Sequence, residues 1–587
     1  MIAARAFASA LARNGVRVVF GYPGATALAL FDALGERDDI RIVLTRHEQG
    51  AAFAANGVAR ATGRAGTVLV TSGPGATNTV TAIADAYMDS IPLVVFTAQV
   101  ATAVIGSDAF QETDIFGVTM PITKHSFLVK DARDLPFIID EAYRLATTGR
   151  PGPVLVDIPV DVAEADIGDD TAGEYVPSRA VVPDAPAAAV LARAAQMLTD
   201  AERPLILAGG GVIASGASDV LTQLAHANGI PVVSTLMGRG AFNEDDPAWL
   251  GMAGMFGHAS ANAALHAADV LLAVGTRFAE RVAADPTRLA PGGQLIHVDI
   301  DAAEVDKRRR ADLALIGDAR AILGAIQQHI QQLAAPGRSD ARAAGLSDVD
   351  RGTAHETPAQ TPAPTTSQGA DTRPAAETVS AHMLTPEYII AALDRTCRET
   401  ELLGRPTIRV TEVGQNQMWT AVGSRFRTPR SLLTSGGLAA MGFGLPAATG
   451  AAIARPDALV VNISGDGSFQ MNLQELATVA GLMIPLKVFI LNNAGLGLVR
   501  QWQDARFGGR HVASDLAPDL PDIVALAHAY GLVGMRAATC GQFDTALIAA
   551  LATPGPAIVD CRISPDAHVS SVEQSRRQMG DVTEGSR

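Results

Sequence analysis

Short apolar runs alternate with segments of helical periodicity along most of this chain. In its first part, the pattern predicts buried strands at residues 16–20, 41–44, 67–71, 93–97 and 154–158. Continuous apolar strands separated by helices are typical of parallel sheets that are covered on both faces. We therefore expect an α/β domain over residues 1–165.

The same alternation returns twice. Runs at 204–208, 232–234, 270–274 and 295–300 predict a second α/β domain over residues 186–335, and the pattern resumes for a third domain over 384–569. The fold class expected is thus α/β, with three doubly wound parallel-sheet domains.

Two segments break this pattern. Residues 334–382 contain no aromatic residue and no isoleucine, so they cannot bury enough apolar surface to order themselves. We expect a flexible linker over residues 336–383 and, from its polar composition, a tail over 570–587.

Composition narrows the function classes. The formal charge of −15 argues against nucleic-acid or anionic-membrane partners. The three scattered cysteines form neither a disulfide framework nor a metal motif, which favours a reducing cytoplasm. No apolar run reaches the ~20 residues that span a bilayer. Residues 1–14 carry arginine and no acid, but a predicted strand follows at once, so we interpret them as a first helix rather than a transit peptide.

Two polar loops in the third domain carry the strongest chemical signal. Gly465-Asp466-Gly467 follows the predicted strand 458–463, and Asn493 follows the strand 486–491, with a helical pattern over 469–482 between them. Such loops lie at the carboxyl ends of adjacent parallel strands, where α/β sheets bind ligands. Carboxylate and amide oxygens there suit Mg²⁺ holding a diphosphate. The plain alternative is a turn plus an asparagine-rich loop.

The motif in the third domain changes the interpretation of one glutamate in the first domain. Glu48 precedes a helix, where an acid ordinarily interacts with the helix dipole. Thiamin diphosphate (ThDP) chemistry, however, needs a carboxylic acid against N1′ of the aminopyrimidine, which converts the 4′-amine into an imine. We therefore interpret Glu48 as the activator of that cofactor.

Three further loops have compositions that suit cofactor contacts. Residues 71–78 are rich in small groups and can form a wall around a ring, although an ordinary strand–helix turn would look the same. Gly414-Gln415-Asn416 follows a predicted strand and can donate hydrogen bonds to a diphosphate. Met441 can wedge between the two rings of ThDP, although most methionines only fill a core.

Together these motifs resemble the large catalytic subunits of acetohydroxyacid (acetolactate) synthase, within the ThDP-dependent decarboxylase and carboligase superfamily. The resemblance runs from about residue 3 to 565. It is carried by residues 21–24 (GYPG), 46–60 (RHEQGAAFAANGVAR), 71–78 (TSGPGATN), 107–112 (SDAFQE), 150–159 (RPGPVLVDIP), 234–241 (STLMGRGA), 411–419 (TEVGQNQMW), 434–448 (TSGGLAAMGFGLPAA) and 465–479 (GDGSFQMNLQELATV).

The resemblance implies ThDP pyrimidine-binding, middle and diphosphate-binding domains, in that order. Mg²⁺ would be held by Asp466, Asn493 and the carbonyl of Gly495. The catalytic set implied is Glu48, Gln111, Met441, Arg281 and Trp502, of which Arg281 and Trp502 would bind the second keto acid. The residues implied to bind ThDP are Gly414, Gln415, Asn416, Gly437, Met441, Gly465, Gly467 and Ser468.

The family also binds FAD, and most matching positions lie in the middle domain. They are Arg150, Phe110, Gly209, Gly210, Gly211, Thr235, Leu236, Met237, Gly254, Gly257, Arg277, Val282, Asp299, Ile300 and Asp318. The resemblance further implies a homodimer or tetramer with its active site at the subunit interface, and a possible regulatory subunit.

The reaction expected is decarboxylation of pyruvate and joining of the hydroxyethyl unit to a second 2-keto acid, as in branched-chain amino-acid biosynthesis. Departures from the family leave alternatives open. Ala25, Phe256 and Ala279 replace a family glycine, histidine and acid, and Asn416 replaces a histidine. Val160 and Leu498 also depart, and the tail lacks a proline-rich closing segment. One alternative is another ThDP-dependent 2-keto-acid decarboxylase or carboligase of secondary or degradative metabolism. Another is a non-catalytic paralogue.

Overall fold

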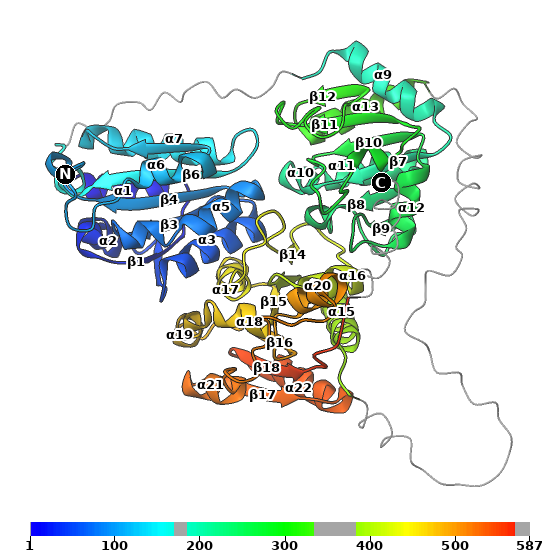
Figure 1. The fold of residues 1–587 in the computed structure, drawn as a ribbon. Coiled ribbons are helices and arrows are strands. Elements are labelled where there is room, and N and C mark those ends of the chain that lie inside the picture. The colour runs from blue at the N-terminus through cyan, green and yellow to red at the C-terminus, as the bar shows by residue number, and fades with distance from the viewer. Residues whose placement is uncertain (1, 169–184, 334–382, 570–587) are drawn as a thin grey trace, which may run out of the picture.

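The computed structural model describes residues 2–168, 185–333 and 383–569, and each range holds one α/β domain (Figure 1). We call these the first, middle and third domains. Each contains a six-stranded sheet whose strand pairs are all parallel, so the expected fold class is confirmed. The expected tail, and all of the expected linker except Met383, lie outside the described residues. Within the described ranges, no helix is both long and apolar enough to cross a membrane.

The sheet of the first domain has the order β2-β1-β3-β4-β6-β5. The predicted strands form, and β5 is added to them. The strands are β1 (Val18–Tyr22), β2 (Arg41–Leu44), β3 (Gly66–Val70), β4 (Leu93–Gln99), β5 (His125–Leu128) and β6 (Pro153–Pro159). The helices are α1 (Ala3–Arg13), α2 (Leu28–Gly35), α3 (Glu48–Thr62), α4 (Pro74–Thr77), α5 (Val80–Met88), α6 (Ile115–Thr119), α7 (Leu135–Thr147) and α8 (Val160–Glu164).

The middle domain has a different order, β12-β11-β10-β7-β8-β9. Its chain starts at β7 in the centre and reverses direction between β7 and β10, as in dinucleotide-binding sheets. The strands are β7 (Pro204–Ala208), β8 (Val232–Ser234), β9 (Trp249–Met252), β10 (Val270–Val274), β11 (Gln294–Asp299) and β12 (Leu313–Ile316). The helices are α9 (Ala188–Asp200), α10 (Gly210–Ala214), α11 (Ser218–Asn228), α12 (Ala259–Ala267) and α13 (Ala319–Leu333).

The third domain repeats the order of the first, β14-β13-β15-β16-β18-β17. Its strands are β13 (Thr407–Thr411), β14 (Leu432–Leu433), β15 (Leu459–Gly465), β16 (Lys487–Asn492), β17 (Val533–Ala537) and β18 (Ala557–Arg562). Its helices are α15 (Pro386–Leu402), α16 (Gln415–Gly423), α17 (Gly444–Ala454), α18 (Asp466–Gln470), α19 (Leu476–Gly481), α20 (Gly497–Phe507), α21 (Ile523–Ala529) and α22 (Cys540–Ala552).

One sequence prediction in this domain is wrong. Residues 469–482 do not form one helix, because α18 ends at Gln470 and α19 starts at Leu476. Between them Asn472 adopts φ −136° and ψ 29°, outside the helical region, and its side chain donates to the carbonyl of Gly442 at 2.7 Å. This side chain-to-backbone bond competes with helix continuation.

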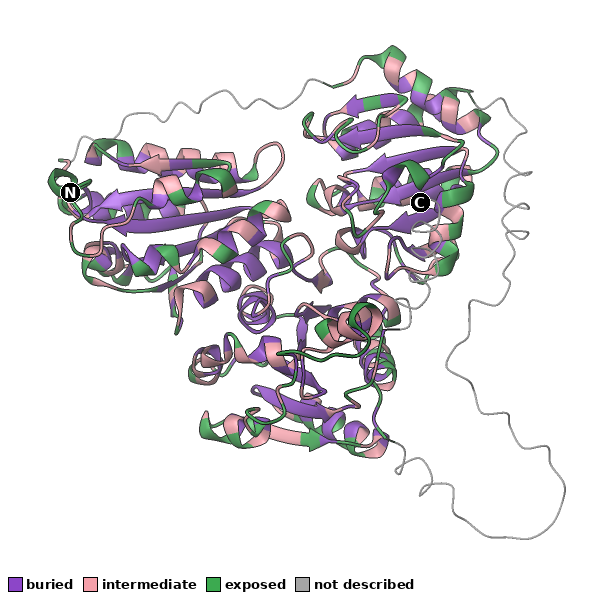
Figure 2. Ribbon diagram, in the orientation of Figure 1, coloured by how far each residue is buried: buried purple, intermediate pink, exposed green. Residues whose placement is uncertain are grey.

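Helices α3 and α17 hold the first and third domains together. Each follows the second strand of its sheet, and both are buried along nearly their whole length (Figure 2). Their contact is reciprocal: a Cβ on Gly57 would lie 2.0 Å from the carbonyl oxygen of Ala447, and one on Gly450 would lie 1.9 Å from that of Ala54. Only glycine fits at such an approach. One hydrophobic core therefore runs through both domains.

Buried charge joins the middle domain to the third. The guanidinium of Arg239 donates to Glu244 at 2.6 Å and to the carbonyl of Ser424 at 2.8 Å. The same glutamate accepts from the backbone N–H of Phe426 at 2.8 Å. Arg239 and Glu244 are fully buried, so removing either one would leave an uncompensated charge.

Candidate functional site

The Asp466 carboxylate lies at the junction of β15 and α18. Its Oδ1 accepts a hydrogen bond from the N–H of Gly467 at 2.8 Å. Its Oδ2 accepts one at 3.3 Å from the N–H of Gly495, which lies on the loop after the neighbouring strand β16. Burial raises the pKa of Asp466 to about 6, although these backbone donors pull it down. A nearby cation would strongly stabilise the ionised form of such a buried carboxylate.

Asn493 presents its amide oxygen to the same place. Its Oδ1 accepts from the N–H of Gly495 at 3.2 Å, while its Nδ2 donates to Oε1 of Gln415 at 3.2 Å. The three residues predicted to hold a metal, Asp466, Asn493 and Gly495, therefore lie together. Their role as ligands stays a prediction.

The donor set itself indicates which ion would fit. Among the described residues, no group of three or more His, Cys, Asp or Glu side chains could hold a metal. A cation at Asp466 would therefore be completed by amide and carbonyl oxygens and by oxygens of a bound ligand. Mg²⁺ is commonly held in this way, by one or two carboxylates together with phosphate oxygens.

The predicted diphosphate loop lies beside this carboxylate. Gly414 has φ +114° and precedes α16, whose N-terminus has no side-chain cap, so its first N–H groups are free to meet an anion. The amide oxygen of Asn416 is buried without a partner among the described residues, a condition that a bound ligand relieves. A Cβ on Gly465 would lie 3.2 Å from Nδ2 of Asn416. Ser468 donates to the carbonyl of Val413 at 3.4 Å.

The side chain of Gln415 makes contacts that the sequence did not predict. Besides accepting from Asn493, it donates to Oε1 of Gln501 at 3.0 Å and to the carbonyl of Ala567 at 2.8 Å. Gln501 in turn donates to the carbonyl of Val569 at 3.0 Å. Only the backbone N–H of Gln415 is thus left for a diphosphate. Sequence reasoning missed Gln501, for which its place beside Trp502 was the available signal.

Met441 and Gly437 lie on the loop that leads into α17. Met441 is half-buried, and its Cε lies 3.9 Å from the position of a Cβ on Gly467. A Cβ on Gly437 would lie 2.6 Å from Nη2 of Arg277 in the middle domain and 2.8 Å from Oδ1 of Asp89 in the first. Residues from all three domains therefore meet at this loop.

Glu48 is the first residue of α3 and is half-buried. Its Oε2 accepts from Nδ2 of Asn78 at 2.9 Å, and its Oε1 lies 3.4 Å from the position of a Cβ on Gly75. The loop over residues 71–78 thus forms a wall beside Glu48. Glu475 of the third domain accepts from the N–H of Arg46 at 2.9 Å, just before the helix.

Gln111 lies next to the same loop, and Phe110 does not. The carbonyl oxygen of Gln111 lies 2.7 Å from the position of a Cβ on Gly73, and the residue has φ +59°. Phe110 is 88% exposed on the surface. Glu48 and Gln111 therefore flank one loop at the same edge of the first sheet.

The predicted flavin loops follow β7 and β10, on either side of the point where the strand order reverses. Gly209, Gly210 and Gly211 come directly after β7. A Cβ on Gly209 would lie 2.1 Å from the carbonyl oxygen of Gly275, which follows β10. These glycines therefore allow the two loops to approach closely. Thr235 accepts from the N–H of Gly238 at 3.1 Å and fixes the turn that holds Leu236 and Met237.

Arg150 of the first domain reaches the middle domain, and its contact with a flavin stays a prediction. It donates to Glu304 at 2.6 Å and to Asp301 at 3.1 Å. Burial raises the pKa of neighbouring Asp299. The second carboxylate oxygen of Glu304 is buried without a hydrogen-bond partner among the described residues.

Some of the other predicted residues pack closely against backbone, and others lie at or near the surface. A Cβ on Gly254 would lie 2.2 Å from the carbonyl oxygen of Arg281, and one on Gly257 would lie 2.2 Å from that of Met252. Val282 and Ile300 are half-buried, and Asp318 accepts from the N–H of Ala321 at 3.0 Å. The side chain of Arg281 is exposed, and Trp502 on α20 lies under the guanidinium of Arg506 at 4.2 Å.

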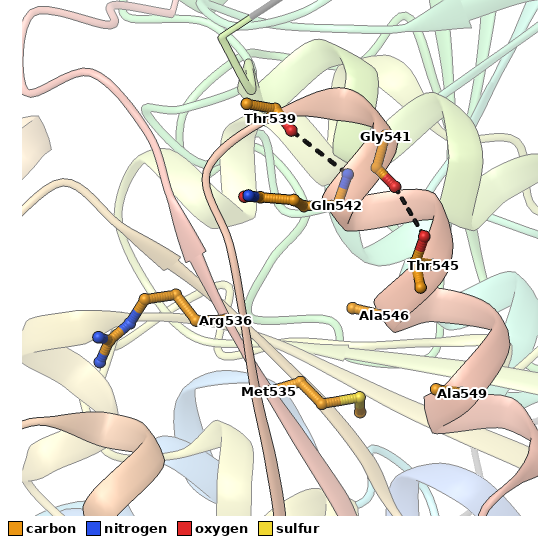
Figure 3. Close-up of a pocket in the computed structure, with 8 residues that line it drawn as sticks. All are labelled: Met535, Arg536, Thr539, Gly541, Gln542, Thr545, Ala546 and Ala549. Atoms are coloured by element: carbon orange, nitrogen blue, oxygen red, sulfur yellow. Dashed lines mark hydrogen bonds between the residues drawn. The ribbon is translucent and has the colours of Figure 1, made fainter. Parts of the chain in front are cut away.

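A separate surface hollow contains none of these residues. It lies between the edge strand β17 and α22 (Figure 3), where Thr539 accepts from the N–H of Gln542 at 3.3 Å. It is lined by Met535, Arg536, Thr539, Gly541, Gln542, Thr545, Ala546 and Ala549. This hollow is therefore separate from the sheet edge that bears Asp466.

Family models match all three domains. Residues 1–118 match the thiamine pyrophosphate enzyme N-terminal TPP binding domain, residues 191–326 its central domain, and residues 412–561 its C-terminal TPP binding domain. The fold and the site thus define a thiamin-diphosphate-dependent enzyme.

Curated relatives narrow this class. The chain is 43% identical to a probable acetolactate synthase large subunit of Methanocaldococcus jannaschii, over 96% of this chain and 92% of the relative. It is 41% identical to an acetolactate synthase large subunit of Parasynechococcus marenigrum, over 95% and 87%. An acetolactate synthase of Mycobacterium bovis is 43% identical, over 96% and 88%. This chain belongs to the acetolactate synthase large-subunit family.

Proposed function

We propose that this enzyme decarboxylates pyruvate and joins the resulting two-carbon unit to a second 2-keto acid. The single observation that carries the proposal is the convergence of Asp466, Asn493 and Gly495 at one sheet edge, in a chain whose relatives are acetolactate synthases. Bound ThDP supplies the nucleophilic carbon and the electron sink for this chemistry. The chain itself supplies binding, orientation and proton control.

We propose Mg²⁺ as the ion that links the diphosphate to the third domain. Asp466 would contribute the charged oxygen, and Asn493 and the carbonyl of Gly495 would contribute neutral ones. The raised pKa of Asp466 supports this proposal, because a cation would restore the ionised form. The N-terminus of α16 would meet the phosphate oxygens.

We propose that Glu48 holds the proton that faces N1′ of the aminopyrimidine. The side chain of Asn78 accounts for one carboxylate oxygen and sets the orientation of the group. Gln111, beside the same loop, would face the substrate. For Glu48 and Asp466 to act on one ThDP molecule, its aminopyrimidine must lie at the sheet edge of a first domain and its diphosphate at the sheet edge of a third domain. The two domains can belong to different copies of the chain.

We propose that Arg281 and Trp502 bind the second keto acid. The exposed guanidinium of Arg281 can pair with the substrate carboxylate. Trp502 offers an indole face beside Gln501, which is linked through Gln415 to Asn493. Contact of Arg281 and Trp502 with a common substrate stays a proposal.

We propose FAD as a ligand of the middle domain. Its support is the strand order, the glycine loops after β7 and β10, and the reach of Arg150 from the first domain. The buried, unpartnered oxygen of Glu304 beside Arg150 supports it further, since bound ligands often satisfy such atoms.

We propose a homo-oligomer whose site is completed by a second copy. Among the described residues, Glu48 bonds to Asn78 within the first domain, and Asp466 bonds to Gly467 and Gly495 within the third. Large apolar side chains are also exposed near the site residues, including Leu438, Met471, Val499 and Phe507, and exposed apolar groups of this kind mark protein interfaces. The names of the relatives as large subunits support a regulatory partner, and the buried free cysteines support a reducing cytoplasm.

A second candidate keeps the cofactor and changes the product. Phe256, at a position where the family has histidine, is buried in the apolar cluster of the third domain. This loss of a polar contact favours another ThDP-dependent 2-keto-acid decarboxylase or carboligase.

One assay separates the two candidates. Purified protein with ThDP and Mg²⁺ is given pyruvate alone and then a panel of 2-keto acids, and the products are identified. Acetolactate would support the synthase, whereas an aldehyde would support a decarboxylase. No turnover of any 2-keto acid would contradict both.

A further inference from the structure

Glu412 is a fully buried carboxylate outside the set of predicted site residues. It follows β13 by one residue, and its backbone N–H donates to the carbonyl of Ile463 on β15 at 3.2 Å. It therefore lies among the strand ends that lead to Gly414 and Asp466. Burial raises its pKa to about 7, and among the described residues no ion pair partners it.

The carboxylate holds the turn that precedes α17. One oxygen accepts from the N–H of Gly442 at 3.0 Å and the other from the N–H of Gly444 at 2.8 Å. Phe443, the residue before α17, provides no side-chain cap, so Glu412 satisfies these donors from the loop after β13. A Cβ on Gly444 would lie 2.8 Å from the carboxylate, which shows how closely the two pack.

A second side chain, that of Asn472, also bonds to this turn. Asn472 donates from Nδ2 to the carbonyl of Gly442 at 2.7 Å. Gly442 has φ +83°, and a Cβ there would lie 2.8 Å from Nδ2 of Asn472. Gly442 is thus held at its N–H by Glu412 and at its carbonyl by Asn472.

Met441 immediately precedes this held glycine. Glu412 accepts a hydrogen bond from the N–H of Gly442, which belongs to the peptide that joins Met441 to Gly442. The carboxylate therefore fixes the backbone from which the Met441 side chain projects. That side chain reaches Gly467 in the metal loop. A thioether is only a weak hydrogen-bond acceptor, so the backbone that carries it has more influence on its direction.

We propose that Glu412 is a positioning residue, which holds Met441 in the direction that supports the bound cofactor. This inference rests on the proposed role of Met441. Displacement of a supporting group by about 1 Å lowers turnover by up to ~10²-fold. Affinity for ThDP depends mainly on Asp466 and its neighbours and should change far less.

A double-mutant cycle on the full-length enzyme tests this inference. Wild type, E412Q, M441A and E412Q/M441A are loaded with ThDP and Mg²⁺, and kcat, KM for pyruvate and Kd for ThDP are measured. We expect E412Q to lower kcat by ~10-fold or more while Kd changes less than ~3-fold. We expect the double variant to match M441A within ~2-fold, because the two residues act as one unit.

The matched control is Asp157→Asn. Asp157 is also buried, with a pKa raised to about 7, but it lies on β6 of the first domain, where Thr97 and Gln99 donate to it at 2.7 and 3.0 Å. It should leave kcat within ~2-fold of wild type. Should E412Q fail to fold, Asn472→Ala replaces it in the same cycle, with the same expectation.

Three outcomes overturn the inference. Multiplicative losses in the double variant would show that Glu412 acts separately from Met441. An E412Q enzyme with wild-type kcat would remove Glu412 from the site. Wild-type kcat in M441A would refute the proposed role of Met441 itself and the inference with it, whereas the first two outcomes leave that role standing.

Discussion

Nδ2 of Asn78 donates a hydrogen bond of 2.9 Å to Oε2 of Glu48. Asn78 follows the small-residue helix α4 after β3, and Glu48 begins α3 after β2, so the bond joins two loops at one edge of the first sheet. It fixes the orientation of a carboxylate that would otherwise be free to rotate at the start of a helix. Glu48 therefore has a defined orientation before any cofactor binds.

Replacing Glu48 by glutamine should lower turnover by on the order of 10²-fold or more, because the acid proposed to activate the aminopyrimidine is lost while its shape remains. Affinity for ThDP should change less, since Asp466 and its neighbours are proposed to hold the diphosphate. Steady-state kinetics and ThDP titration measure the two effects. Gln49→Ala on the same turn is the control. A Glu48→Gln enzyme with wild-type turnover would contradict this role.

Replacing Asp466 by alanine should raise the ThDP concentration needed for activity by ~10²-fold or more, because the charged ligand proposed for Mg²⁺ is lost. Titration of the apoenzyme with ThDP at fixed Mg²⁺ measures this change. Asp457→Ala is the matched control, because Asp457 is exposed and pairs with Arg455 at 2.8 Å. Equal ThDP affinity in both variants would show that Asp466 does not hold the metal.

The alternation of apolar runs predicted the sheets well, because parallel strands are buried on both faces and have few polar positions to obscure them. Runs 41–44, 204–208 and 270–274 match β2, β7 and β10 without error. Strands β5, β9, β12, β14, β17 and β18 were not predicted individually. The edge strand β17 gives the weakest signal, since its burial is partial and its sequence includes Gly534 and Arg536.

The candidate site could be predicted where short motifs directly follow neighbouring strands. Asp466 and Asn493 were found because strand order brings the ends of adjacent strands together, and the family resemblance added Gly495. Glu412 and Gln501 were not, since their partners lie on other elements and nothing in the linear sequence marks that pairing. The expected single helix over 469–482 failed for the same reason, because the partner of Asn472 is Gly442.

Purified protein should carry FAD substoichiometrically or bind it when it is added, with absorbance near ~450 nm. The glycine loops and Arg150 support the proposed site, while Ala279 and Phe256 stand where the resemblance implies an acid and a histidine. A heat-denatured extract identifies bound flavin, and a titration with FAD measures affinity. Full carboligase activity in protein that binds no FAD would place this chain in a flavin-free branch.

Asp157 should make the protein less stable as pH rises. Burial raises its pKa from the ordinary value to about 7, so the folded state binds the proton more tightly than the unfolded state. Its stabilising contribution is fully present below about pH 4 and is lost as pH rises through about 7. Asp157→Asn is neutral throughout, so its melting temperature should rise relative to wild type between pH 5 and pH 8. A constant difference across this range would contradict the assignment.

Gly450→Ala should destabilise the contact between α3 and α17, because the new methyl would lie 1.9 Å from the carbonyl oxygen of Ala54. Overpacking of this kind costs about 1–3 kcal/mol or more. Gly481→Ala on α19 is the control, since a Cβ there meets no atom within 4 Å. Thermal unfolding of the two variants measures the difference. Equal melting temperatures would show that the helices can separate without loss.

The reciprocal contact of α3 and α17 also restricts how this sequence can diverge. Ala54 and Gly57 on one helix face Ala447 and Gly450 on the other, so a larger residue in either pair forces both domains apart. Among homologues, these four positions should therefore change together or remain small. Each domain constrains the mutations that the other can accept, although the whole middle domain separates the two helices in the sequence.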